Sequence, residues 1–155
     1  MKKLFTALLC TALLVFGLTG CGGKEKEVSV DTAKLASELL TAVTSDTLSE
    51  TASDMLPSIY FFEASDIAEG VAYASSGATA CEVAVVKSTD AKNTANVEKL
   101  FQTRVDNQSS LYASYNQGEV EKLDAAIIKS AGAYTVLCVC DDTDKANEIL
   151  KGYGF

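Results

Sequence analysis

Histidine is absent from all 155 residues of the sequence. It is the side chain whose ordinary pKa lies closest to neutral pH, and it is the commonest general base and metal ligand in enzymes. Its absence excludes the Ser–His and Cys–His dyads that activate many nucleophiles. The chain also lacks the Gly-x-x-x-x-Gly-Lys-Ser/Thr pattern of phosphate-binding loops and the Gly-x-Ser-x-Gly pattern of serine hydrolases. These absences favour a protein that is not an enzyme and has no cofactor.

Positive charge is also scarce. Without Lys2 and Lys3, which precede the first apolar run, the 13 basic residues fall to 11 against 21 acidic residues, so the formal charge is −10. Phosphate backbones and anionic lipid head groups repel such a surface, so we expect no nucleic-acid partner and no electrostatic adhesion to a membrane. A basic protein partner or bound cations remain compatible with this charge.

No apolar run is long enough for a typical transmembrane helix. Residues 4–18 carry no charge, follow two lysines and precede small residues. A helix needs about 20 apolar residues to cross the hydrocarbon core of a bilayer. A basic start, a short apolar segment and a small-residue cleavage region are the three parts of a secretory signal. We therefore expect residues 1–20 to be a signal peptide.

Leu18-Thr19-Gly20-Cys21 at the end of this segment resembles the lipobox of bacterial lipoproteins. The resemblance implies cleavage between Gly20 and Cys21, lipid such as palmitate on Cys21, and a protein anchored to the extracytoplasmic face of the cell membrane. The alternative is an ordinary signal peptide with a chance cysteine. Residues 21–30 are glycine-rich and charged, which predicts a flexible tether. By length, residues 31–155 form one domain.

Five cysteines are present, and two of them belong to this N-terminal region. Cys81, Cys138 and Cys140 remain, an odd number that does not indicate a disulfide framework. The favoured interpretation is that they serve as small buried apolar residues. One disulfide from Cys81, a three-thiolate metal site and a thiol-dependent redox protein or enzyme are the alternatives. Cys138 and Cys140 lie two apart on a predicted strand, so a bond between them would be strained.

The apolar pattern of the domain alternates between helical and extended periods. Apolar residues spaced by three and four predict helices after Asp31, after Asp90 and after Asp141 or Asp142. Extended apolar segments separated by turns predict two hairpins. We expect an α+β fold, a two-layer sandwich with an antiparallel sheet of about four strands and helices on one face, in the order ββαββα after an N-terminal helix. The predicted strands cover residues 67–75, 81–88, 125–130 and 134–140.

Residues 47–66 are the hardest part of the sequence to interpret: one interpretation is a short strand over residues 47–51 and a short helix over residues 53–60, interrupted at Pro57. The segment also includes the aromatic run Tyr60-Phe61-Phe62. The first interpretation is that these rings cover the edge of the core. The second is a candidate contact patch, since aromatic side chains anchor many interfaces. The acidic run from Asp141 to Asp144 lacks the spacing of a calcium loop, and we interpret it as the capped start of a helix.

Five segments share a common pattern and order: the lipobox at residues 18–21, residues 76–80 leading into 82–85, residues 115–123, and residues 134–138 running into Asp141-Asp142. In this pattern the chain resembles a family of small Gram-positive lipoproteins whose domain has no assigned function. The resemblance spans about residues 31–151, and its most specific part is the turn from Gly77 to Ala80. This chain departs from the family pattern at Cys81, where an acid is usual. The family supplies no catalytic residues. We therefore expect a lipid-anchored module of the cell envelope that binds an envelope protein or a small ligand.

Overall fold

The computed structural model describes residues 28–155. The predicted signal peptide, the cleavage position Gly20–Cys21 and most of the tether lie outside the described residues. The helices are α1 (Thr32–Leu39), α2 (Leu56–Tyr60), α3 (Thr94–Tyr112), α4 (Gln117–Asp124) and α5 (Thr143–Tyr153), and short 3-10 turns are η1 (Leu40–Ala42), η2 (Ser53–Met55), η3 (Ala64–Asp66) and η4 (Ala91–Asn93). The strands are β1 (Ser49–Thr51), β2 (Ile67–Ala74), β3 (Glu82–Ser88), β4 (Ile127–Ala131) and β5 (Tyr134–Val139).

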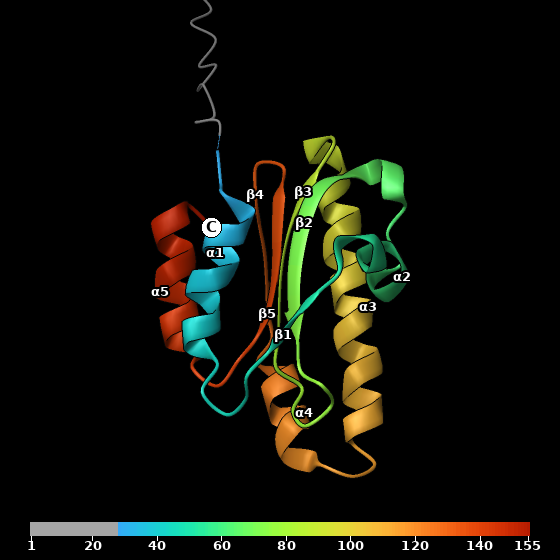
Figure 1. Ribbon diagram of the computed structural model, residues 1–155, viewed down its shortest axis with the longest axis vertical. Helices are drawn as coiled ribbons and strands as arrows, with labels where there is room; N and C mark the ends of the chain where they lie inside the picture. Colours follow the sequence, from blue (N-terminus) through green and yellow to red (C-terminus); the bar gives the residue numbers. More distant parts are fainter. Residues whose placement is uncertain (1–27) are drawn as a thin grey trace, which may run out of the picture.

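These strands form one antiparallel sheet in the order β1-β2-β3-β5-β4 (Figure 1). The two predicted hairpins are β2–β3 and β4–β5, and they are joined side by side through the pairing of β3 with β5. The predicted α+β class with an antiparallel sheet is confirmed. A fifth strand, β1, extends the sheet at its β2 edge, within residues 47–51, for which a short strand was one interpretation of the sequence.

Helices cover both faces of the sheet, rather than the one face that we expected (Figure 1). Alternate residues of β3 explain the two layers. Ala84 and Val86 pack in a core with α2, α3 and α4, whereas Val83 and Val85 pack in a second core with α1 and α5. Every residue of β5 is buried, as a strand covered on both faces requires. The fold is therefore a three-layer arrangement.

Helix starts follow the predicted caps. The Asp31 carboxylate accepts a hydrogen bond from the backbone N–H of Lys34 at 2.9 Å, and that of Asp142 accepts one from Lys145 at 2.9 Å. Asp90 accepts from Lys92 at the start of η4, which leads directly into α3. Each carboxylate satisfies an N–H group that has no partner within its helix. Asp141 is not a cap, although it stands beside one.

The aromatic run is divided between core and surface. Tyr60 and Phe62 are buried and pack against Phe101 of α3, with ring centroids 5.2 and 5.6 Å from it. Phe61 is 62% exposed. The three rings therefore do not form one surface. Of the candidate contact patch, Phe61 is the ring that is exposed and could contact a partner.

We predict that Phe61→Gly stabilises the fold. Phe61 closes α2 in the left-handed region, with φ of 60°, and it is the only non-glycine residue with positive φ among residues 28–155. This conformation costs an L-residue about 1 kcal/mol, which glycine does not incur. Urea denaturation should show a gain below or near that value. Phe61→Ala is the control and should show no such gain; equal gains in both variants would contradict the argument.

Candidate functional site

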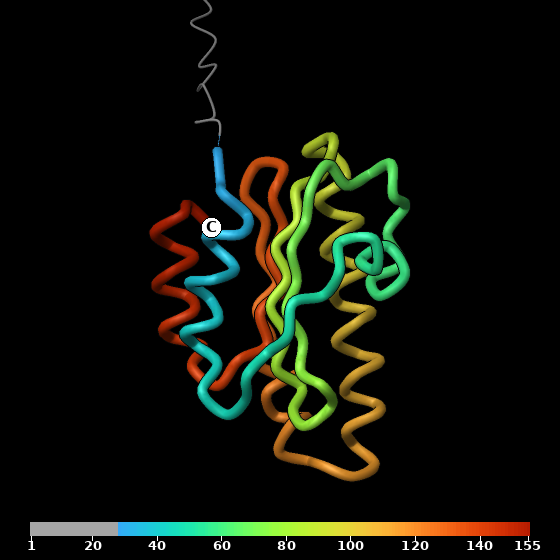
Figure 2. Tube along the Cα trace, in the orientation of Figure 1, coloured from blue at the N-terminus to red at the C-terminus, as the bar shows by residue number. Residues whose placement is uncertain are grey.

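Four segments that are distant in sequence meet at one end of the sheet. They are the loop after η1, the β2–β3 turn, α4 and the residues that follow β5, and Figure 2 shows them together at the end opposite residue 28. Connections at the ends of strands place side chains from several elements close together, and functional residues often lie on such loops. We call this end the tip.

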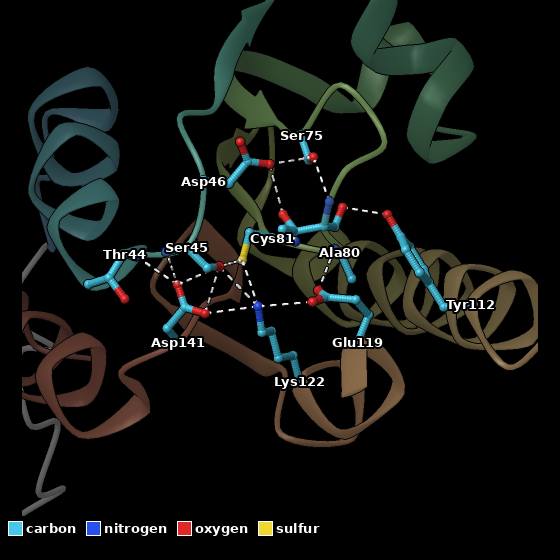
Figure 3. A network of polar contacts seen from close by, with 11 residues as sticks. Thr44, Ser45, Asp46, Ser75, Ala80, Cys81, Tyr112, Glu119, Lys122 and Asp141 are labelled. Carbon is cyan, nitrogen blue, oxygen red and sulfur yellow. Dashed lines mark hydrogen bonds and ion pairs between the residues drawn. The ribbon is translucent and has the colours of Figure 1, made fainter. Parts of the chain in front are cut away.

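Lys122 of α4 lies at the centre of the polar contacts at the tip (Figure 3). Its ammonium lies 3.1 Å from Glu119 Oε1, one turn earlier in the helix, and 2.9 Å from Asp141 Oδ1. It also donates a hydrogen bond to Ser45 Oγ at 3.0 Å and contacts Cys81 Sγ at 3.9 Å. The Lys122 side chain is 21% exposed. The ammonium is thus surrounded by two carboxylates, a hydroxyl and a thiol.

Asp141 joins the end of β5 to the loop after η1. Its Oδ2 atom accepts hydrogen bonds from the backbone N–H groups of Thr44 at 2.6 Å and Ser45 at 2.8 Å, and Ser45 Oγ donates to Oδ1 at 2.8 Å. These contacts span 97 positions of sequence. With Lys122, they fix the loop, the strand end and α4 relative to one another.

The pKa values of this pair follow from its surroundings. Burial alone would lower the pKa of Lys122, but hydrogen bonds with Asp141 and Glu119 raise it well above its ordinary value. Burial alone would raise the pKa of Asp141, but Lys122 and the backbone N–H groups of Thr44 and Ser45 hold it well below its ordinary value. Both groups therefore remain charged across the physiological pH range.

The β2–β3 turn is attached to the tip on its other side. Asp46 Oδ2 accepts hydrogen bonds from Ser75 Oγ at 2.6 Å and Thr79 Oγ1 at 2.9 Å, and these hydroxyls lower the pKa of Asp46. Glu119 Oε2 accepts from the backbone N–H of Ala80 at 2.8 Å. Asp46, Glu119 and Asp141 each therefore have donors from more than one residue, so this part of the tip is preorganised.

Tyr112 and Tyr115, at the end of α3, border the turn. Tyr112 is buried, and its hydroxyl donates to the backbone oxygen of Thr79. Burial and the neighbouring Tyr115 raise the pKa of Tyr112 to about 12. Tyr115 packs against it at a ring distance of 5.1 Å but is 60% exposed, and Leu111 is 54% exposed. Two exposed side chains with apolar area therefore lie around the end of α3, next to the tyrosine that contacts the β2–β3 turn.

The three candidate thiols are buried and free. Burial raises the pKa of Cys81, although hydrogen bonding with Thr79 and Ser45 and the charge of Lys122 oppose the shift. Hydrogen bonding with Cys140 and burial raise the pKa of Cys138 well above its ordinary value. Because the thiolate is the reactive form, these shifts argue against Cys81 and Cys138 as nucleophiles. Within residues 28–155, the three thiols and nearby acids are not arranged as a metal-binding group.

Hydrogen bonding with Cys138 lowers the pKa of Cys140, so we predict slow alkylation in the native protein for Cys81 and Cys138. Cys81 and Cys138 should react with iodoacetamide at least about tenfold more slowly than a free thiol of ordinary pKa, because each must first be exposed and deprotonated. Rates can be followed on tryptic peptides 35–87 and 130–145, which separate Cys81 from the other two. The same chain in denaturant is the control. A fast-reacting thiol at Cys81 in the native chain would contradict this prediction and favour a thiol-dependent enzyme.

The contacts of Lys122 and Ser45 differ from those of a lysine that activates a serine nucleophile. A Ser–Lys pair catalyses acyl transfer when the lysine is neutral and accepts the hydroxyl proton. Here Lys122 is held protonated, and it donates to Ser45 Oγ, whose proton is directed to Asp141. The hydroxyl therefore has no base among its contacts that is suited to activate it at neutral pH.

Sequence reasoning missed this cluster because it assigned the acids at 141 and 142 one interchangeable role. A helix start needs one capping carboxylate, and Asp142 provides it. Asp141 was not needed as a cap, so its presence was the feature of the sequence from which a second contact could have been predicted. Cys81, where the sequence departs from the pattern of the family that it resembles, also lies at the tip, and its Sγ atom is 3.9 Å from Lys122 Nζ.

Comparisons with known proteins identify one family. The model of the family described as "Domain of unknown function (DUF4358)" matches residues 42–140. The match begins just before the loop that contains Ser45 and ends one residue before Asp141. No curated protein and no solved structure matches the chain. Within residues 28–155, no helix combines the length and the apolar character needed to span a membrane.

Proposed function

The chain belongs to the DUF4358 family, and from its geometry we propose that the domain is a binding module of the cell envelope, anchored outside the cell by lipid on Cys21. The observation that carries the proposal is that Lys122 is held protonated in ion pairs. This central cation is paired with Glu119 and Asp141 and stays protonated, so the tip offers a fixed surface rather than a base or nucleophile. The absence of histidine supports binding over catalysis.

The direction of the tip supports this proposal. The described chain begins at the end of the molecule opposite α4 (Figure 1). A tether from Cys21 therefore joins the domain at the far end from Lys122, so the tip can point away from the lipid surface. Two or more acyl chains hold a protein stably on a bilayer, whereas one holds it marginally.

The partner we propose is an envelope protein with a basic, partly apolar surface. The formal charge of −10 for the chain after residue 20 favours a basic partner through long-range attraction. The exposed Tyr115 and Leu111, around the end of α3, provide apolar contact area. Tyrosine is enriched among residues that dominate interface energy.

Anchoring is tested by Cys21→Ala. Because lipid attaches to the Cys21 sulfur, we expect the variant to lose all incorporation of a labelled fatty acid and to accumulate unprocessed or released protein. Fractionation of cells and metabolic labelling measure both effects. Cys10→Ala, within the same segment, is the matched control and should be labelled normally. A Cys21→Ala protein that remains labelled and membrane-bound would contradict the anchor.

Binding is tested by photo-crosslinking in intact cells. A photoreactive amino acid at Tyr115 should give a discrete crosslinked product, whereas one at exposed Ala91 of η4, at the other end of the sheet, should not. The Tyr115 product should weaken as salt is raised, since the attraction is electrostatic. Phe61 is tested in parallel as the alternative contact. Products from Phe61 alone, or equally from every position, would refute binding at the tip.

A further inference from the structure

Cys81, Cys138 and Cys140 share one face and one end of the sheet. In the β3–β5 pair, Glu82 lies opposite Val139 and Val83 lies opposite Cys138. Extending this antiparallel register by one residue places Cys81 opposite Cys140. Val83, Cys138 and Cys140 all belong to the core under α1 and α5. Because side chains alternate along a strand, Cys81 lies on the same side as Val83.

This placement distinguishes the three pairs of thiols. Directly opposite residues of antiparallel strands have Cα atoms about 4.5 or 5.5 Å apart, within the range of about 4.4–6.8 Å that disulfides adopt. Cys81 and Cys138 are diagonal neighbours, which are typically about 7–8 Å apart. Cys138 and Cys140 are separated by one residue along an extended chain, about 6.6 Å or more. The Cys138–Cys140 spacing is therefore at the upper limit of the disulfide range, and only the Cys81–Cys140 pair lies well inside it.

We propose that Cys81 and Cys140 form a reversible cross-strand disulfide when the protein meets a disulfide oxidant, such as oxidised glutathione or a thiol oxidoreductase. The S–H bonds of Cys81 and Cys140 break and one S–S bond forms between them. The S–S bond of the oxidant breaks, and its two sulfurs take up the two protons as thiols. The oxidant thus accepts the two electrons that the cysteines lose.

The bond changes the tip, because Cys81 is part of it. Its sulfur lies 3.7 Å from Ser45 Oγ and 3.9 Å from Lys122 Nζ (Figure 3). Bonding to Cys140 turns the sulfur toward β5 and away from these groups. Cys140 directly precedes Asp141, which holds Lys122 and the loop after η1. Thiol oxidation is therefore coupled to the cluster, and the reduced form is the one described above.

Peptide mapping tests the proposal on the full chain. The protein is equilibrated with an excess of oxidised glutathione, its remaining thiols are alkylated in denaturant, and it is digested with trypsin without reduction. Cys81 lies in peptide 35–87, Cys138 and Cys140 lie in peptide 130–145, and Cys10 and Cys21 lie in peptide 4–24. We expect peptide 35–87 linked to peptide 130–145, and reduction should separate them.

Two matched variants identify the bonded sulfur. Cys138→Ala should keep the linked peptides, because the remaining thiol in peptide 130–145 is Cys140. Cys140→Ala should lose most of the linked product under the same conditions. Absence of the linked product in Cys138→Ala, or its full retention in Cys140→Ala, would overturn the assignment. The Cys138→Ala result is decisive even if Cys140→Ala fails to fold, and neither outcome depends on lipid at Cys21 or on a binding partner.

Discussion

Lys122→Met should lower the free energy of unfolding by about 3 kcal/mol at pH 7, since removing one partner of a buried ion pair leaves the other charge unpaired. Two carboxylates, Glu119 and Asp141, lose their ammonium in this variant, and their side chains are only 10% and 18% exposed. Urea denaturation measures the loss. Lys99→Met is the matched control, because Lys99 is exposed on α3 and should change stability by less than about 0.5 kcal/mol.

The loss in free energy of unfolding caused by Lys122→Met should depend on pH in a defined direction. The pKa of Asp141 is held below its unfolded value of about 3.9, so its contribution to stability is present above that pH and is lost as pH falls below it. The pKa of Lys122 is raised, so its contribution is present below about pH 10.4 and is lost as pH rises through the folded pKa. The difference between wild type and Lys122→Met should therefore be largest at intermediate pH. A difference that does not change from pH 3 to pH 7 would refute the ion pair as its cause.

Arg104→Met should lower the free energy of unfolding by about 3–5 kcal/mol, because it leaves the carboxylate of Glu82 unpaired inside the protein. Glu82 is only 3% exposed at the start of β3. Its Oε2 atom accepts from Arg104 Nε and Nη2, both at 3.1 Å, and Tyr60 donates to Oε1 at 2.6 Å. Burial and the charge of Glu82 raise the pKa of Tyr60 well above its ordinary value, so Tyr60 remains a donor.

The double variant Arg104→Met/Glu82→Gln separates charge from packing. A neutral amide can keep the hydrogen bond from Tyr60 without an unpaired charge, so we expect the double variant to be more stable than Arg104→Met alone. Thermal and urea unfolding of the four proteins in this cycle give the coupling energy. If the double variant loses as much stability as the two single variants added together, the residues act independently and the argument fails.

Local patterns predicted most elements of the fold but not its layers. The helix after Asp31, both hairpins and the final helix were predicted because their spacing of apolar residues is a local property. Which face of the sheet a helix covers depends on the path of the chain, and the apolar stripe of α1 carries no information about it. The fully apolar segment from Tyr134 to Val139 was the one indication of burial on both faces.

The candidate site was less predictable from the sequence than the fold, because it depends on contacts between residues that are far apart in the sequence. Lys122 contacts Glu119 in its own helix, which a spacing of three residues makes foreseeable. Its contacts with Ser45 and Asp141 exist only because the loop after η1 and the end of β5 meet at the same edge. The strand β1 was one interpretation of residues 47–51 but was not counted in the expected sheet of about four strands, because three residues are too few to establish a period and pairing with β2 defines them.

The two ends of the described chain have a practical consequence for experiments in cells. The C-terminus lies beside α1, near residue 28 (Figure 1). Tyr153 donates to Glu38 of α1 at 2.9 Å, which holds the last helix against the first. A fluorescent reporter fused after Phe155 would therefore sit next to the tether and leave Tyr115 and Lys122 unobstructed. An insertion at the exposed Gly77 turn would instead crowd the surface on which recognition is proposed.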